Sequence, residues 1–211
     1  MKYVAEKYSE LCKTNSDINE HLPILYNYAK KCESVFETGV RGVISSWALI
    51  YGLLSNKDIS APRIFMNDIS ECDLTEILEK TKKLDIKISY KWCNNLTLDF
   101  DKEKFDLTFI DTWHVYGQLK RELTKFNKIT NKYIIMHDTT IDEYLGESLR
   151  MGWDIFKQNE ITGIPIEEIK KGLWPAIEEF LFKNKEWSLK KRYSNNNGLT
   201  ILEKNNSIIR N

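Results

Sequence analysis

Short apolar runs alternate along the chain with longer segments whose apolar residues recur at helical spacing. The runs predict strands over residues 34–38, 63–67, 86–92, 106–110 and 132–136. The longer segments predict helices over residues 45–54, 74–84 and 115–126, the first of them capped by Ser45 or Ser46. Strands that alternate with helices in this way predict crossover connections and a parallel sheet.

The C-terminal part has a different pattern. Residues 166–182 have helical spacing, and we expect Pro175 to bend that helix. A turn at 195–198 joins predicted strands 186–192 and 199–203, which would form an antiparallel hairpin. We interpret the long irregular stretch 138–165 as a lid or substrate region. The predicted fold is α/β, Rossmann-like and doubly wound, with a mostly parallel seven-stranded sheet that ends in this antiparallel hairpin.

The composition is that of one globular domain. The 211 residues suffice for a single α/β domain, with residues 1–32 as an N-terminal helical cap and 33–211 as the Rossmann-like domain. The formal net charge is +0, so no basic excess indicates a nucleic-acid partner. Apolar runs fall short of the roughly 18 residues that span a bilayer, and residues 1–20 lack a signal-peptide pattern. We therefore expect a cytoplasmic protein without a membrane or nucleic-acid partner.

The cysteines and one histidine carry no predicted chemistry. Cys12, Cys32, Cys72 and Cys93 are far apart, which argues against a zinc site and against a disulfide scaffold. We expect them to be free and mostly buried. His21 follows residues 16–20, which we interpret as a helix-cap segment.

A glycine turn follows the first predicted strand and contains Glu37, Gly39 and Gly42. Ligands of open parallel sheets bind beyond the carboxyl ends of such strands, and Gly39 lets the backbone approach a ligand closely. Glu37 stands where a dinucleotide fingerprint has its first glycine, so it would repel a pyrophosphate and suit a cationic ligand. An ordinary turn with a surface Glu37 and a nicotinamide-dependent oxidoreductase remain the alternatives.

Acidic residues and histidines follow three later strands. Asp68 ends the second predicted strand, where a carboxylate can accept hydrogen bonds from both ribose hydroxyls. Asp111 and His114 follow residues 106–110, and His137 and Asp138 end the next strand. Adjacent parallel strands would bring Asp111 and Asp138 together, where they repel unless a proton or a cation separates them. Oxygen ligands suit Mg²⁺ better than Zn²⁺.

The ordered motifs resemble those of the class I S-adenosylmethionine (SAM)-dependent methyltransferases. Glu37-x-Gly39-x-x-Gly42 and Asp68 look like the first two motifs of that family, although Arg41 stands where a further glycine is usual. Asp111-Thr-Trp-His114 followed by His137-Asp138 resembles the metal-dependent small-molecule O-methyltransferases of the catechol, macrolide-sugar and cephalosporin-biosynthesis types.

The resemblance implies SAM as methyl donor and Mg²⁺ as second cofactor. The implied metal ligands are Asp111 and Asp138, with His137 where relatives have a further acid or amide. His114 would be the general base, because the sugar-modifying members have a histidine at this spacing. At its usual pKa of about 6.5, His114 would be largely unprotonated at neutral pH. The residues expected around the donor are Glu37, Gly39, Gly42, Asp68, Asn94, Asn95 and Trp113.

The resemblance also implies an acceptor hydroxyl on a small molecule, with a sugar or nucleotide-sugar as first choice, and a homo-oligomeric assembly. Trp113 either packs on the adenine or fills the core. Two further alternatives stay open: a metal-free methyltransferase that uses His114 or His137, and a non-catalytic binding protein of the same fold.

Overall fold

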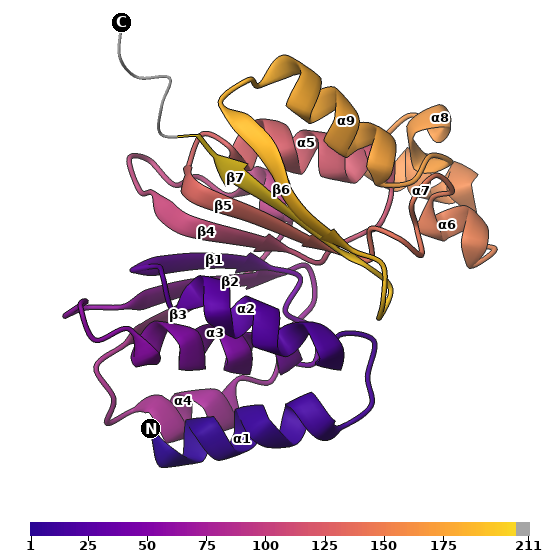
Figure 1. The fold of residues 1–211 in the computed structure, drawn as a ribbon. Helices are drawn as coiled ribbons and strands as arrows, with labels where there is room; N and C mark the ends of the chain where they lie inside the picture. The colour runs from indigo at the N-terminus through magenta and orange to yellow at the C-terminus, as the bar shows by residue number, and fades with distance from the viewer. Residues whose placement is uncertain (206–211) are drawn as a thin grey trace, which may run out of the picture. The chain divides into compact units, whose positions relative to one another are not determined.

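The computed structural model describes residues 1–205 (Figure 1). Its strands form a seven-stranded sheet in the order β3-β2-β1-β4-β5-β7-β6. Strand β1 pairs in parallel with β2 and β4, and β2 pairs in parallel with β3, whereas β7 runs antiparallel to both β5 and β6. The predicted Rossmann-like, mostly parallel sheet with a C-terminal antiparallel hairpin is therefore confirmed. Within residues 1–205, none of the helices is both long and apolar enough to span a membrane.

The chain divides into two compact units. The first contains residues 1–110 and 129–131, and the second contains residues 111–128 and the chain from Lys132 onward. The expected boundary between residues 1–32 and 33–211 stays a prediction.

The first unit carries four strands and the N-terminal helices. Its strands are β1 (Ser34–Thr38), β2 (Arg63–Asp68), β3 (Lys87–Trp92) and β4 (Phe105–Ile110). Its helices are α1 (Lys2–Lys13), η1 (Asn19–His21), α2 (Leu22–Ala29), α3 (Ile44–Ser55), α4 (Thr75–Thr81) and η2 (Asn95–Thr97). Helix α2 lies along α3 (Figure 1). Gly52 permits this close approach, because a Cβ atom there would lie 2.6 Å from the Tyr26 carbonyl oxygen.

The second unit carries the C-terminal strands and five helices. Its strands are β5 (Thr130–His137), which starts in the first unit, β6 (Trp187–Tyr193) and β7 (Leu199–Lys204). Its helices are α5 (Tyr116–Phe126), α6 (Glu147–Arg150), α7 (Ile155–Thr162), α8 (Ile166–Ile169) and α9 (Trp174–Lys183). Helix α5 packs against α9 and α8, and α7 packs against α8 (Figure 1).

Two predictions for this part of the chain are wrong. Residues 138–165 are not irregular throughout, because α6 and α7 lie within them. Residues 166–182 do not form one bent helix but two helices, α8 and α9. Pro175 lies in the first turn of α9, where its missing N–H breaks no helical bond, so it begins a helix instead of bending one. The amides of Gly172, Leu173 and Trp174 between the helices donate to carbonyl oxygens of residues 142–144.

The predictions for the cysteines and His21 are correct in part. All four cysteines are free, but only Cys32 is buried. The other three are partly exposed, because they lie in the surface helix α1, in the loop after β2 and directly after β3, so the expectation that most are buried is wrong. His21 lies at the N-terminal boundary of α2, yet its side chain is buried and makes no capping hydrogen bond to that helix.

Candidate functional site

The glycine turn after β1 has a backbone that only partly suits L-residues. Gly39, Arg41 and Val43 have φ angles of 88°, 41° and 64°. The Gly39 amide donates to the Asn67 carbonyl oxygen at 2.9 Å, which ties the turn to β2. Glycine adopts the left-handed region freely, so Gly39 has a backbone reason for its identity. The predicted strand, turn and helix are all present.

Glu37 is fully buried at the end of β1. Its Oε1 accepts a hydrogen bond from the Ser45 hydroxyl at 2.6 Å, and its Oε2 accepts one from Ser46 at 2.7 Å. The positive end of α3 favours a carboxylate there. Ser45 and Ser46 therefore bind Glu37 and do not cap α3, which begins at Ile44 after Val43. Both the predicted serine cap and the alternative of a surface Glu37 are wrong.

Asp68 fastens the glycine turn to the end of β2. Its Oδ2 accepts the Arg41 amide at 2.9 Å, and its Oδ1 accepts the Ser70 amide at 2.8 Å. These bonds hold a carboxylate at the place where the ribose was predicted to bind. Asn94 accepts the Leu96 amide at 2.9 Å and thereby caps η2.

A chain of buried polar side chains joins the carboxyl ends of β1, β2 and β3. Thr38 donates to the Asn67 Oδ1 atom at 3.0 Å, and Asn95 donates to the Thr38 hydroxyl at 2.9 Å. Asn67 also donates to the carbonyl oxygens of Lys91 and Cys93 at 2.8 and 2.9 Å. Sequence reasoning found Asn95 but missed Thr38 and Asn67, although polar residues that end buried strands were a usable signal.

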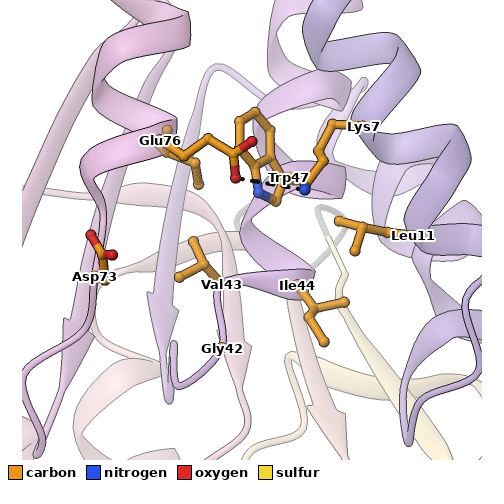
Figure 2. Close-up of a pocket in the computed structure, with 9 residues that line it drawn as sticks. Lys7, Leu11, Gly42, Val43, Ile44, Trp47, Asp73 and Glu76 are labelled. Atoms are coloured by element: carbon orange, nitrogen blue, oxygen red, sulfur yellow. Dashed lines mark ion pairs between the residues drawn. The ribbon is translucent and has the colours of Figure 1, made fainter.

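A pocket of ≈ 200 Å³ lies beside the glycine turn in the first unit (Figure 2). An ion pair of 3.6 Å joins Lys7 Nζ and Glu76 Oε2 at its wall. The lining residues are Lys7, Leu11, Gly42, Val43, Ile44, Trp47, Asp73, Glu76 and Ile77. Of the residues predicted to bind the donor, the lining includes Gly42 only.

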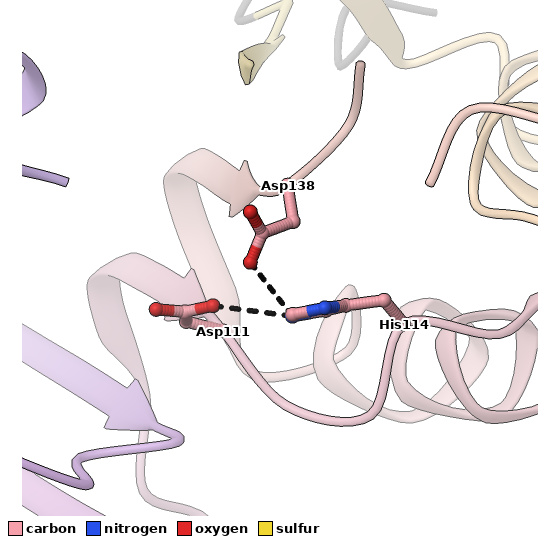
Figure 3. Close-up of side chains that lie close together, drawn as sticks. All are labelled: Asp111, His114 and Asp138. Carbon is pink, nitrogen blue, oxygen red and sulfur yellow. Dashed lines mark hydrogen bonds and ion pairs between the residues drawn. The ribbon is translucent and has the colours of Figure 1, made fainter. Parts of the chain in front are cut away.

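The second unit brings Asp111, His114 and Asp138 together (Figure 3). His114 Nε2 lies 3.3 Å from Asp111 Oδ1 and 3.2 Å from Asp138 Oδ2. Asp111 follows β4, His114 precedes α5, and Asp138 follows β5 with a φ of 56°. The prediction that Asp111 and Asp138 lie close together is confirmed.

His137 contacts the same two acids. Its Nδ1 atom lies 3.3 Å from Asp138 Oδ2 and 3.7 Å from Asp111 Oδ1, and its Nε2 atom lies 3.2 Å from the Asn196 carbonyl oxygen. Burial lowers the pKa of His137, but the bonds and charges of Asp111 and Asp138 outweigh that effect and raise it to about 10. Burial also raises the pKa of Asp111, whereas the two histidines hold it well below its usual range.

The imidazole of His114 has acids on both of its nitrogens. Nδ1 lies 3.3 Å from Asp142 Oδ2 and 3.5 Å from Glu147 Oε2. Burial lowers the pKa of His114, but its contacts with Asp111 and Asp142 and the charge of Asp138 raise it well above its usual value. With only the protein's own charges around it, the protonated form of His114 is favoured. This direction is opposite to the ordinary pKa on which the expectation of an unprotonated His114 rests.

The arrangement fits a divalent cation. One ligand atom each from Asp111, His114 and Asp138 lies within 4.8 Å of the others. Asp138 Oδ1 is buried and accepts no hydrogen bond from the residues that the structure describes. An acceptor oxygen without a partner, beside a second carboxylate, is what an oxygen-binding cation such as Mg²⁺ would satisfy. The histidine in this group is His114, whereas the sequence pointed to His137.

Trp113 packs within the second unit. Its ring lies against a cluster of the buried residues Val115, Ile164 and Ile169, and its indole N–H donates to the Ser148 hydroxyl at 2.9 Å. These contacts match the alternative in which Trp113 fills the core, and its contact with an adenine stays a prediction.

No family model matches the chain, and no curated protein matches it. Solved structures do match. The O-methyltransferase from Bacillus cereus in complex with S-adenosylhomocysteine (SAH) is 16% identical, with 96% of this chain and 89% of that chain covered and a TM-score of 0.58. The chain has the Rossmann-like methyltransferase fold.

Two other structures show how widely the methyltransferase fold is shared. The SAH-bound methyltransferase from Podospora anserina is 14% identical, covers 95% of this chain and 87% of its own, and gives a TM-score of 0.56. The N-methyltransferase NodS from Bradyrhizobium japonicum is 13% identical, covers 90% of this chain and 98% of its own, and gives a TM-score of 0.58. Since both O- and N-methyltransferases match, the fold alone leaves the acceptor atom open.

Proposed function

We propose that the protein is a SAM-dependent O-methyltransferase that acts on a hydroxyl of a small molecule with the assistance of Mg²⁺. The observation that carries this proposal is the cluster of Asp111, His114 and Asp138 at the ends of β4 and β5. Carboxylates at this place in a methyltransferase fold are suited to hold a cation near an acceptor oxygen.

The proposal of SAM as donor rests on the turn after β1 and the acid after β2. Gly39 opens the backbone at the turn, and Asp68 presents a carboxylate at the end of the next strand. The similar structures from Bacillus cereus and Podospora anserina hold SAH, the product that SAM leaves after methyl transfer. Glu37 contributes differently from the prediction, because its carboxylate oxygens bind Ser45 and Ser46.

Methyl transfer from SAM breaks the bond between the methyl carbon and the sulfonium sulfur and forms a bond from that carbon to the acceptor oxygen. The attack is in line, with reacting atoms held about 3–3.5 Å apart. The sulfur keeps the electron pair of the broken bond and becomes the neutral thioether of SAH. The acceptor hydroxyl must also lose its proton to a base.

We assign that proton to His114 Nε2, the ring nitrogen that faces Asp111 and Asp138. Bound Mg²⁺ would take up the charge of the two carboxylates, which lowers the pKa of His114 and of a nearby hydroxyl. Asp111 and Asp138 hold the cation in this proposal, and His137 supports both carboxylates from its Nδ1 side. General-base catalysis of this type contributes about 10²–10⁴-fold to the rate.

The test is calorimetric titration of the purified protein with SAH, with and without Mg²⁺. We expect binding in the micromolar range, and transfer of a labelled methyl group to a hydroxylated acceptor that a chelator abolishes. Transfer that resists the chelator would favour a metal-free methyltransferase. No SAH binding under either condition would contradict the proposal, and nicotinamide cofactors would then be titrated.

For the acceptor we propose a sugar or a nucleotide-sugar. The spacing of Asp111 and His114 supports this choice, since it resembles that of the sugar-modifying members of the family. Three aromatic side chains of the predicted substrate region, Tyr144, Trp153 and Phe156, are 63%, 44% and 69% exposed and could stack on a ring. A panel of nucleotide-sugars, glycosides, catechols and amines tests this, and methylation of the amines alone would contradict it.

A further inference from the structure

Acidic side chains lie close to both ring nitrogens of His114, and the two pairs of acids differ in their proposed roles. Nε2 faces Asp111 and Asp138, the acids proposed to hold a cation. Nδ1 faces Asp142 and Glu147, which have no role in the proposed reaction. A carboxylate that binds one ring nitrogen of a histidine fixes the orientation of the ring and so the direction of the other nitrogen. The acids on the Nδ1 side therefore set how Nε2 faces Asp111 and Asp138.

Asp142 is the better fixed of the two acids on that side. Its side chain is 0% exposed. Arg150 donates hydrogen bonds to both carboxylate oxygens, from Nε to Oδ1 at 2.6 Å and from Nη2 to Oδ2 at 2.9 Å. Such a bidentate pair fixes the plane of the carboxylate as well as its position. The backbone of Asp142 is fixed too, because its amide donates to the Asp138 carbonyl oxygen at 3.1 Å and its own carbonyl accepts the Leu173 amide at 2.8 Å.

Glu147 is occupied mainly with the backbone of His114. Its Oε2 accepts the His114 amide at 3.2 Å, and its own amide donates to the His114 carbonyl oxygen at 3.0 Å. Its side chain is 18% exposed and lies farther from Nδ1 than Asp142 does. Glu147 thus places the main chain of His114, and Asp142 is the carboxylate nearest to Nδ1, which the described residues leave without a hydrogen bond of regular geometry.

We propose that Asp142 is a positioning residue that accepts a hydrogen bond from Nδ1–H of His114 and so fixes the ring with Nε2 facing Asp111 and Asp138. Arg150 holds the Asp142 carboxylate in the required orientation. The pair works like other histidine–carboxylate pairs, in which the carboxylate fixes the tautomer and the orientation of the ring. The functional meaning rests on the proposed methyl transfer, whereas the contact itself lies within the second unit.

The test is proton NMR of the protein labelled with nitrogen-15 histidine, without added metal or donor. The chain has only three histidines, so three pairs of ring nitrogens need assignment, and His114→Gln identifies those of His114. We expect an Nδ1–H signal of His114 that exchanges slowly with water, because its acceptor is buried. Asp142→Asn should abolish that signal.

Two variants control for indirect effects. Glu147→Gln should retain the signal, and so should Glu143→Gln, which breaks the pair with Arg192 at 2.9 Å next to Asp142 without touching His114. If Asp142→Asn does not fold, Arg150→Lys serves as the second variant, because it keeps the charge but loses the bidentate contact with Asp142. It should broaden the Nδ1–H signal of His114 and speed the exchange of that proton with water. A signal that survives in Asp142→Asn, or that disappears in Glu147→Gln instead, would overturn the proposal.

A second measurement connects the contact to the cation. Asp142→Asn should weaken Mg²⁺ binding, because the ring beside Asp111 and Asp138 loses the carboxylate that holds it in place, whereas Glu143→Gln should leave it unchanged. Equal Mg²⁺ affinities for Asp142→Asn and the native protein would also count against the proposal. If the protein bound no SAH but gave the expected NMR result, the proposed function would be contradicted and the positioning role of Asp142 would still be supported.

Discussion

Single residues at the end of β1 show that a motif predicted to bind a ligand also holds a turn in place. Glu37 lies where a donor ligand was predicted, but its two oxygens accept the hydroxyls of Ser45 and Ser46. All three side chains are buried, so each hydrogen bond replaces water that the groups cannot reach. The arrangement joins the end of β1 to the first turn of α3 and thereby fixes the glycine turn between them.

We therefore predict that Ser46→Ala lowers the free energy of unfolding by about 1.5–3 kcal/mol, because one oxygen of a buried carboxylate loses its donor. Ser55→Ala, in the last turn of the same helix, removes a bond to the Tyr51 carbonyl oxygen, which is neutral, and should cost less than about 1.5 kcal/mol. Urea unfolding of both variants measures the difference. Equal losses of unfolding free energy in the two variants would mean that the hydrogen bond to Glu37 stabilises the fold no more than one to a neutral acceptor.

At the scale of elements, the break between α8 and α9 supports the acid cluster. Gly172 lies against the segment that carries Asp142, and a Cβ atom there would lie 2.3 Å from the Asp142 carbonyl oxygen. Gly172→Ala should cost about 1–3 kcal/mol by forcing this contact apart, and it should weaken Mg²⁺ binding by displacing Asp142.

Gly163→Ala is the matched control for this substitution. Gly163 has a φ of 69° but nothing within 4 Å of an added Cβ, so alanine there meets only backbone strain. Its cost should be about 1–2 kcal/mol, with Mg²⁺ affinity unchanged. Thermal unfolding and Mg²⁺ titration distinguish the two variants, and an effect of Gly163→Ala on Mg²⁺ binding would contradict the explanation.

Ion pairs connect helices α5 and α8. Glu168 binds Arg121 at 2.5 Å and Lys120 at 3.5 Å. Burial raises the pKa of Glu168, but Arg121 and Lys120 outweigh that effect and lower it below its usual value. A lowered carboxyl pKa stabilises the fold above the unfolded pKa of about 4.3, and the contribution is lost as the pH falls through the folded pKa.

Glu168→Gln should therefore lower stability at pH 7 by less than about 1 kcal/mol, since the partners are partly exposed and solvent screens the pair. The difference from the native protein should shrink as the pH falls from about 4 through the lowered folded pKa of Glu168, below which both proteins carry a neutral group. Urea unfolding across this pH range measures it. A difference that stays constant with pH would show that the loss comes from packing and not from charge.

The same scale shows which elements a sequence pattern can predict. All seven strands were predicted within two residues of their observed ends, the buried ones because they are continuous apolar runs. The break between α8 and α9 was missed because its cause is not local: the amides at 172–174 bond to carbonyl oxygens some thirty residues earlier. Strand order placed Asp111 beside Asp138, but the raised pKa of His114 depends on Asp142 as well as on Asp111 and Asp138, and no periodicity predicts the position of Asp142.

At the scale of the whole molecule, the residues proposed for the two cofactors fall on different units, except for Trp113, the predicted donor contact that lies in the second unit. The turn after β1 and Asp68 belong to the first unit, and Asp111, His114 and Asp138 belong to the second. Since no predicted ligand of either cofactor is shared, binding of SAH and binding of Mg²⁺ should respond to different substitutions.

Two single substitutions test this separation by calorimetry. Asp68→Asn should weaken SAH binding at least about 10-fold, because a carboxylate that accepts from both ribose hydroxyls is lost, and it should leave Mg²⁺ affinity unchanged. Asp111→Asn should abolish Mg²⁺ binding and leave SAH affinity within about threefold. Asp73→Asn is the control, since that acid accepts the Thr75 amide at the start of α4 and has no proposed ligand. If Asp68→Asn weakened Mg²⁺ binding as much as SAH binding, the two sites would not be independent, and the assignment of one cofactor to each unit would be wrong.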